Sequence, residues 1–264
     1  MLSTSVRADS IKRGLDMESL LRKIEENTGP KFSFQVVLNG KGSRIETIFS
    51  PEIAINPGCH YEIAFASLET YYSFPNIDIK NNTLKIYFYG KWHDFEIPVG
   101  CYELTGINAE LQRQMKLQGA KEVVKLEPNL NTFKCIMTVP KDMKVDFKAV
   151  NSLKSVLGFD SKIYGEGRIT SPNTVNIMSV NSVFVHCDLV GSSYLNSKRA
   201  PIIYSFFPDR EPGEKIIQRP NEYIYLPVAS DVIRRMSVWL TDQDQNPLNL
   251  RGETLTCKFH LRSC

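Results

Sequence analysis

Hydrophobic and polar residues alternate with a period of two along most of the chain after Pro30. In the segment 253–261, for example, every second residue from Leu255 to Leu261 is apolar and the residues between them are polar. Alternation of this kind predicts a β-strand with one buried face. Strand-like segments are found at 32–38, 45–49, 60–68, 84–89, 92–97, 123–126, 132–139, 176–189, 202–207, 223–226, 235–241 and 253–261.

Two pairs of these segments flank turn-forming sequences. The tetrapeptide 39–42 (NGKG) separates 32–38 from 45–49, and Gly90-Lys91 separates 84–89 from 92–97. Glycine and asparagine tolerate the positive φ that tight hairpin turns require. We therefore predict a β-hairpin at each of these two places.

The middle third of the chain interrupts the β pattern. Apolar residues recur at four-residue spacing within 106–117, which predicts a helix of about three turns. A second, shorter helix is predicted over 151–157 and ends at Gly158. With the two strands between them, these helices form a predicted α+β insertion over about residues 98–160.

The number of short strands, separated by Gly, Pro and Asn, predicts a mainly β fold over 31–264. An antiparallel β-sandwich or barrel is the architecture expected for such a pattern. A doubly wound α/β fold is disfavoured, because strands and helices do not alternate regularly.

The first 30 residues form a separate predicted segment, an N-terminal arm. Asp16 is suited to cap a short amphipathic helix that Gly29-Pro30 would end. Its apolar face includes Leu20, Leu21 and Ile24, and no helix of comparable quality follows it in the sequence. Three outcomes are open: this face packs on the body of the protein, it packs on another subunit, or the helix frays. We predict Leu20, Leu21 and Ile24 as candidate subunit contacts.

Composition narrows the class of protein. The 264 residues carry 32 basic and 29 acidic side chains, so the net charge of +3 lacks the concentrated positive charge of a specific nucleic-acid binder. No apolar run reaches the roughly 18–20 residues that a membrane span needs. Residues 1–12 lack the apolar core of a secretory signal, so an intracellular protein is expected.

Catalytic and metal-binding motifs are weak. The six cysteines form no CxxC pair, and they are expected to be reduced and structural. In both Cys59-His60 and His186-Cys187, neighbours on a strand point to opposite faces, so neither pair forms a nucleophile–base dyad. A dyad of Cys187 with His60 across the fold stays open. We expect no enzyme activity, no metal site and no cofactor.

Two further patterns allow alternative interpretations. Asp242, Asp244 and Asn246 have the spacing of calcium ligands, but the EF-hand glycine is replaced by Pro247, so turn stabilisation is the preferred explanation. Aromatic residues precede proline in three segments, where they either pack at the corners of the core or anchor subunit contacts. These segments are 71–75, 204–208 and 223–227.

Several segments together resemble the minor capsid (penton) proteins of Polintons, also called Mavericks, and of adintoviruses. The similarity extends from about residue 32 to the end of the chain, with its motifs in the same order. The motifs are 61–75 (YEIAFASLETYYSFP), 97–104 (IPVGCYEL), 152–159 (SLKSVLGF), 202–208 (IIYSFFP), 225–228 (YLPV), 240–244 (LTDQD), 250–253 (LRGE) and 260–262 (HLR).

This resemblance implies a jelly-roll β-sandwich that assembles as a homo-pentamer at the vertices of an icosahedral capsid. The implied partner is a separate major capsid protein with a double jelly roll, and the implied location is the virion, after synthesis inside the host cell. The family carries no catalytic motif, so no residue inherits an active-site role. The alternative is a β-sandwich binding module, lectin-like or receptor-binding, with specificity in the loops 165–173 and 191–200.

Overall fold

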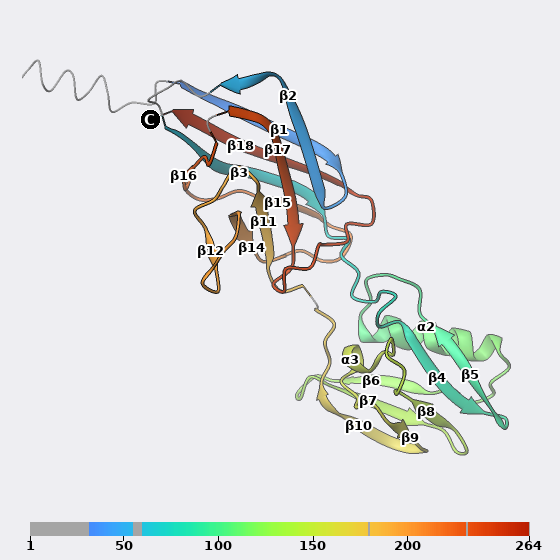
Figure 1. Cartoon of the computed structure of the whole chain (residues 1–264). Coiled ribbons are helices and arrows are strands. Elements are labelled where there is room, and N and C mark those ends of the chain that lie inside the picture. Colours follow the sequence, from blue (N-terminus) through green and yellow to red (C-terminus); the bar gives the residue numbers. More distant parts are fainter. Residues whose placement is uncertain (1–31, 55–59, 179, 231, 264) are drawn as a thin grey trace, which may run out of the picture.

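A computed structural model describes residues 32–54, 60–178, 180–230 and 232–263. The described chain forms two lobes, each with a hydrophobic core of its own (Figure 1). One lobe is a β-sandwich built from both ends of the sequence, and the other is an α+β unit built from its middle. Among the described residues, no helix has the length and apolar character needed to cross a membrane.

The sandwich consists of two antiparallel sheets. The first sheet has the order β1-β18-β3-β15, with β16 also paired to β3, and the second has the order β14-β11-β17-β2. The bounds are β1 Phe32–Lys41, β2 Arg44–Ala54, β3 Tyr61–Tyr71, β11 Val183–Cys187, β14 Ile202–Phe206, β15 Lys215–Gln218, β16 Leu226–Pro227, β17 Val232–Thr241 and β18 Thr254–Ser263. The expected mainly β, antiparallel fold is confirmed.

The eight principal strands pair in a nested pattern. In chain order, the first strand (β1) pairs with the last (β18), β2 with β17, β3 with β15, and β11 with β14. Successive pairs belong to alternate sheets. A long hairpin of four nested pairs that is rolled up in this way supports the jelly-roll interpretation of the sandwich.

The strand at the C-terminal end shows how the sequence pattern builds this core. Leu255, Cys257, Phe259 and Leu261 are buried, and the residues between them are partly exposed, as the alternation predicted. β18 lies between β1 and β3, so these inward side chains reach the middle of the core.

The hairpin predicted around 39–42 is wrong. β1 and β2 follow each other closely but belong to different sheets, since β1 pairs with β18 and β2 with β17. Val36 and Leu38 on β1 and Ile45 on β2 all enter the same core, so the two strands face each other across it. Gly42, at φ 85°, donates its N–H to the carbonyl of Glu253 at 3.0 Å and makes this crossing possible.

The α+β unit contains a four-stranded sheet, β5-β4-β8-β9, and a three-stranded sheet, β10-β7-β6. The helices predicted over 106–117 and 151–157 are confirmed, with shifted starts. The bounds are β4 Thr83–Phe88, β5 Lys91–Glu96, α2 Leu104–Leu117, β6 Lys125–Asn129, β7 Lys134–Val139, β8 Lys144–Asp146, α3 Lys154–Leu157, β9 Ile163–Tyr164 and β10 Gly167–Thr174.

Gly158 ends α3 as predicted. It has φ 77° and the left-handed conformation, and a Cβ at this position would lie 2.4 Å from the carbonyl oxygen of Asn173. Only glycine fits a site with both a positive φ and such a close backbone approach.

In the structure, the α+β unit extends beyond the expected bounds of 98–160 at both ends. Its core begins at Ile77 and includes the predicted hairpin of β4 and β5, which forms as expected. Partly buried Ile177 packs on the same core, so the chain returns to the sandwich only after this residue. The strand predicted over 176–189 is therefore reduced to β11, because residues 176–178 belong to the connection between the lobes.

Candidate interaction surfaces

The cysteines and histidines of the described chain do not assemble into a reactive site. Cys135, Cys187 and Cys257 are buried in the two cores, and burial raises the pKa of Cys135 and of Cys187 to about 12. His60 is exposed just before β3 while Cys187 is fully buried in the core, and no hydrogen bond joins this pair among the described residues. Within the described ranges, no cluster of three His, Cys, Asp or Glu residues is arranged to hold a metal ion.

The Asp242 carboxylate is used by its own turn. Its Oδ1 accepts the backbone N–H of Asp244 at 2.9 Å and of Asn246 at 2.8 Å, and its Oδ2 accepts the Asn246 side-chain amide at 3.0 Å. These contacts are those of a stabilised turn, the explanation that the sequence favoured.

The three aromatic segments before prolines divide between core and surface. Phe74 and Phe206 are buried, and the ring of Tyr204 stacks on Phe65 with the centroids 4.3 Å apart. By contrast, Phe207 is 73% exposed and Tyr223 is 52% exposed. The core interpretation is therefore confirmed for Phe74, Tyr204 and Phe206, and the subunit-contact interpretation stays a prediction for the exposed Phe207 and Tyr223.

Along one long side of the sandwich, no further strand of the described residues covers the sheet edges. β1 and β2 are the outermost strands of their sheets on this side, and they lie next to each other. A groove of about 480 Å³ runs between them. We call this surface the β1–β2 edge; its apolar residues are Phe32, Phe34, Val37, Ile48, Phe49 and Ile53.

The β1 strand lacks the features that usually protect an edge. It is ten residues long, and no charged residue or proline occurs before Lys41. In the described part of the chain, only β18 pairs with it. Long uncharged edges promote association with further chains, and natural monomers avoid them with charges, prolines or short strands. β2, in contrast, carries Pro51 and a register shift in its pairing with β17.

The opposite side of the sandwich carries a second apolar surface. There β14 is the outermost strand of one sheet, and β15 and β16 pair with the outer side of β3 in the other. We call it the β14–β16 edge; exposed apolar residues on or next to its strands are Phe207, Ile217 and Ile224. The ring of Tyr223 lies over the outer face of the first sheet, with its centroid 6.1 Å from that of His260 on β18. The sandwich thus has two different strand edges on opposite sides, and exposed apolar residues lie on or next to each of them.

Next to the β14–β16 edge, Tyr225 is held over the outer face of the first sheet. Its hydroxyl lies 2.7 Å from His260 Nδ1, and the guanidinium carbon of Arg262 lies 3.6 Å from its ring centroid. Arg262 in turn donates two hydrogen bonds to Glu62 Oε2, at 2.9 and 2.7 Å. This network fixes the segment that carries Tyr223 and Ile224.

The predicted contact residues Leu20, Leu21 and Ile24 lie outside the described residues. The candidate contact segments 204–208 and 223–227 include Phe207 and Ile224 of the β14–β16 edge, whereas the β1–β2 edge was not predicted from the sequence. The run without charge from Phe32 to Gly40 was the available signal for β1, but only the strand order reveals that β1 is outermost. The loops 165–173 and 191–200 fall largely in strand β10 and in the small hairpin of β12 (Tyr194–Leu195) and β13 (Lys198–Arg199).

A scan against protein-family models finds no match for this chain, and a search of curated proteins also finds none. Among solved structures, the chain is similar to the crystal structure of the selenomethionine-labelled mavirus penton protein, with 12% sequence identity and a TM-score of 0.46. The alignment covers 88% of this chain and 100% of that chain. No residue role is transferred from this similarity.

Proposed function

We propose that this protein is a structural, non-enzymatic capsid protein that closes a ring by packing against copies of itself. The observation that carries the proposal is the pair of apolar surfaces on opposite sides of the sandwich. A two-fold dimer uses the same patch on both subunits, whereas a closed ring joins two different patches on each subunit. The β1–β2 edge and the β14–β16 edge supply such a pair.

The finer features of the proposal come from the sequence resemblance and the strand pairing. The ordered motifs resemble penton proteins, and the nested strand pairs support a jelly roll. We therefore propose a pentamer at the vertex of an icosahedral capsid, where it also contacts a major capsid protein in the virion. In this arrangement the α+β unit is an insertion between β3 and β11.

Light scattering of the purified chain over a dilution series, at two salt concentrations, tests the ring. The expected species has about five times the chain mass of 30.1 kDa. Because the contact is apolar, its mass should change little with salt. A strict monomer at every concentration would contradict self-association and favour the monomeric binding module.

Two single variants test the head-to-tail geometry. Val37→Lys places a charge on the β1–β2 edge and Ile224→Lys places one on the β14–β16 edge; both side chains are exposed, so the fold should tolerate them. Each variant should lose the ring. Val150→Lys is the matched control, because Val150 is 92% exposed on the α+β unit, and it should keep the wild-type mass.

An equimolar mixture of the two edge variants sharpens this test. One intact β1–β2 edge and one intact β14–β16 edge remain in such a mixture, so heterodimers should form where each variant alone is monomeric. If only one of the two substitutions affects the mass, the contact is two-fold and the ring is wrong.

A chain that lacks residues 1–30 tests Leu20, Leu21 and Ile24: unchanged mass and melting temperature would contradict their role as subunit contacts.

A further inference from the structure

The α+β unit contains a cavity that the ring contact does not use. It has a volume of about 660 Å³ and lies between the β4–β5 turn, the segment after α2 and the turn before β8. Phe88 and Met143 are buried beneath it, with 1% and 6% exposure. A cavity of this size with an apolar floor is in the range of small-molecule sites.

Two tyrosines line the cavity. Tyr87 lies on β4, and Tyr89 forms the following turn with Gly90. Tyr89 has φ 51°, a conformation that is costly for a bulky side chain, and asparagine or glycine would be the ordinary residue in such a turn. Its hydroxyl accepts the backbone N–H of Lys121 at 3.1 Å, which holds the exposed ring at the cavity.

Three lysines also line the cavity: Lys121, Lys141 and Lys144. In the part of the chain that the structure describes, none of them has a carboxylate within 4.0 Å. Lys144 Nζ instead lies 5.9 Å from the ring centroid of Tyr87. Glu122 and Asp142 are the acidic residues of the lining, so positive charge is in excess by one.

This combination selects a ligand with a weakly polar ring face and a single negative charge. Tyrosine rings offer flat surfaces for the C–H faces of a sugar, and an unpaired lysine binds an anionic group as a point charge. A polyphosphate is disfavoured, because the charge excess is small and Lys121 follows the C-terminal end of α2, where the helix dipole is negative. We propose that the cavity binds an acidic saccharide through its carboxylate or sulfate group.

Isothermal titration of the full-length chain with three probes tests this proposal. 3′-Sialyllactose carries one carboxylate, lactose 3′-sulfate carries one sulfate, and lactose is the neutral control. At least one acidic probe should bind at least tenfold more tightly than lactose, and added salt should weaken that binding. The acidic probe that binds identifies which anionic group the site prefers. Equal binding of all three probes, or of none, would overturn the proposal.

Three variants locate the binding. Lys121→Gln combined with Lys144→Gln should reduce affinity for the acidic probe at least tenfold, and Tyr89→Asn, which suits the turn, should reduce it as well. Lys125→Gln is the matched control, since Lys125 is an exposed lysine of the same unit outside the cavity. Light scattering of each variant separates this result from ring formation, because the substitutions lie off both edges. Retained affinity in the double variant, or equal loss in the control, would overturn the site.

Discussion

His186 is a buried titratable residue on the outer side of the second sheet. It is 2% exposed, its Nε2 lies 2.9 Å from Thr241 Oγ1, and its ring stacks on Trp239 with centroids 5.0 Å apart. The guanidinium carbon of Arg44 lies 5.1 Å from the Trp239 centroid. Nδ1 is buried and has no hydrogen-bond partner in the described structure. Burial therefore lowers the pKa of His186 below its ordinary value of 6.5.

This shift predicts a loss of stability in mild acid. An unfolded histidine takes up a proton near pH 6.5, while folded His186 resists protonation, so the free energy of unfolding should fall as pH decreases below about 6.5. His186→Gln keeps a polar side chain that does not titrate, and it should flatten this fall between about pH 7 and pH 5. Urea unfolding at several pH values measures it. The exposed His60→Gln is the control, and identical slopes for wild type and His186→Gln would contradict the prediction.

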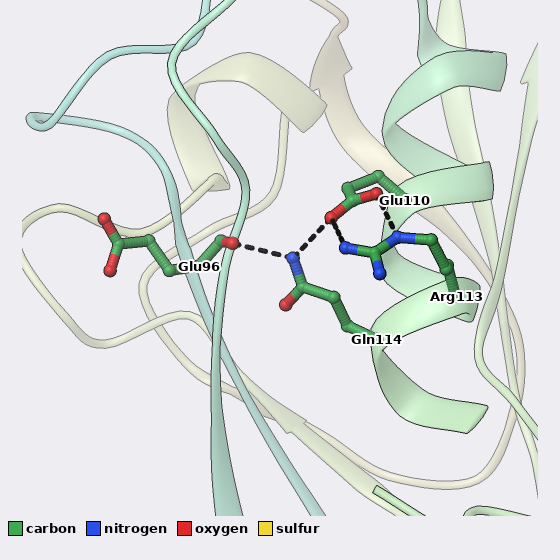
Figure 2. A network of polar contacts seen from close by, with 4 residues as sticks. All are labelled: Glu96, Glu110, Arg113 and Gln114. Atoms are coloured by element: carbon green, nitrogen blue, oxygen red, sulfur yellow. Dashed lines mark hydrogen bonds and ion pairs between the residues drawn. The ribbon is translucent and has the colours of Figure 1, made fainter. Parts of the chain in front are cut away.

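At the scale of elements, a polar network ties α2 to β5 (Figure 2). Arg113 donates Nε and Nη2 to the two carboxylate oxygens of Glu110, both at 2.7 Å. Gln114 Nε2 lies 2.7 Å from Glu110 Oε1 and 2.8 Å from the carbonyl oxygen of Glu96. The hydrogen bond from Arg113 is the main reason that the pKa of Glu110 falls to about 2.

Glu110→Gln should destabilise the α+β unit by about 1 kcal/mol at neutral pH, because a partly exposed bidentate pair and one hydrogen bond are weakened. The contribution of Glu110 is fully present above the unfolded pKa of 4.5 and is lost as pH falls towards 2. The difference between wild type and variant in urea unfolding should therefore shrink over this range. The exposed Glu122→Gln serves as control. A difference that does not depend on pH would mean that the ion pair contributes nothing.

The periodicity of the sequence predicted where helices and strands lie better than it predicted which strands pair with each other. The helix over 106–117 was predictable because Ile107, Leu111 and Met115, which are buried in the structure, repeat at four-residue spacing; buried Leu104, in the first turn, lay outside the predicted range. The turn at 39–42 has the same local chemistry as a hairpin turn, so no local signal distinguishes pairing within a sheet from crossing between sheets. For the same reason, the apolar character of β1 was visible in the sequence, but its outermost position was not.

At the scale of the whole molecule, the boundary between the lobes was the hardest feature to predict. β4 and β5 have the same alternation as the sandwich strands, yet Leu84, Ile86 and Phe95 are buried in the second core. A strand pattern indicates that one face is buried but not which core buries it. The arrangement of the two candidate edges and the cavity could not be predicted from the sequence for the same reason, because each is assembled from segments far apart in sequence.

Asn76 lies where the chain passes between the two lobes. Its side-chain amide donates to the carbonyl oxygens of Tyr102, at 2.6 Å, and Ile177, at 3.0 Å, and its Oδ1 accepts the Tyr102 N–H at 2.9 Å. The outgoing and returning segments are therefore held together at the base of the α+β unit. Because Asn76 contacts Ile177, the two ends of an excised segment 75–178 would lie close together. This segment also contains its own hydrophobic core.

The segment 75–178 should consequently fold alone, with cooperative thermal unfolding and the circular dichroism of α2 retained. Asn76→Ala within it should lower the melting temperature, because two backbone carbonyls and one N–H lose their partner. Asn81→Ala should cost less, because it removes two hydrogen bonds, one to the Asn76 carbonyl and one from the Asp78 N–H, and both lie within one turn. In the complementary experiment, the sandwich with 76–177 replaced by a short Gly-Ser linker should keep the ring mass, because both apolar edges belong to the sandwich. An excised unit without cooperative unfolding would show that the sandwich completes its core. Loss of the ring in an otherwise folded sandwich would place part of the subunit contact on the α+β unit.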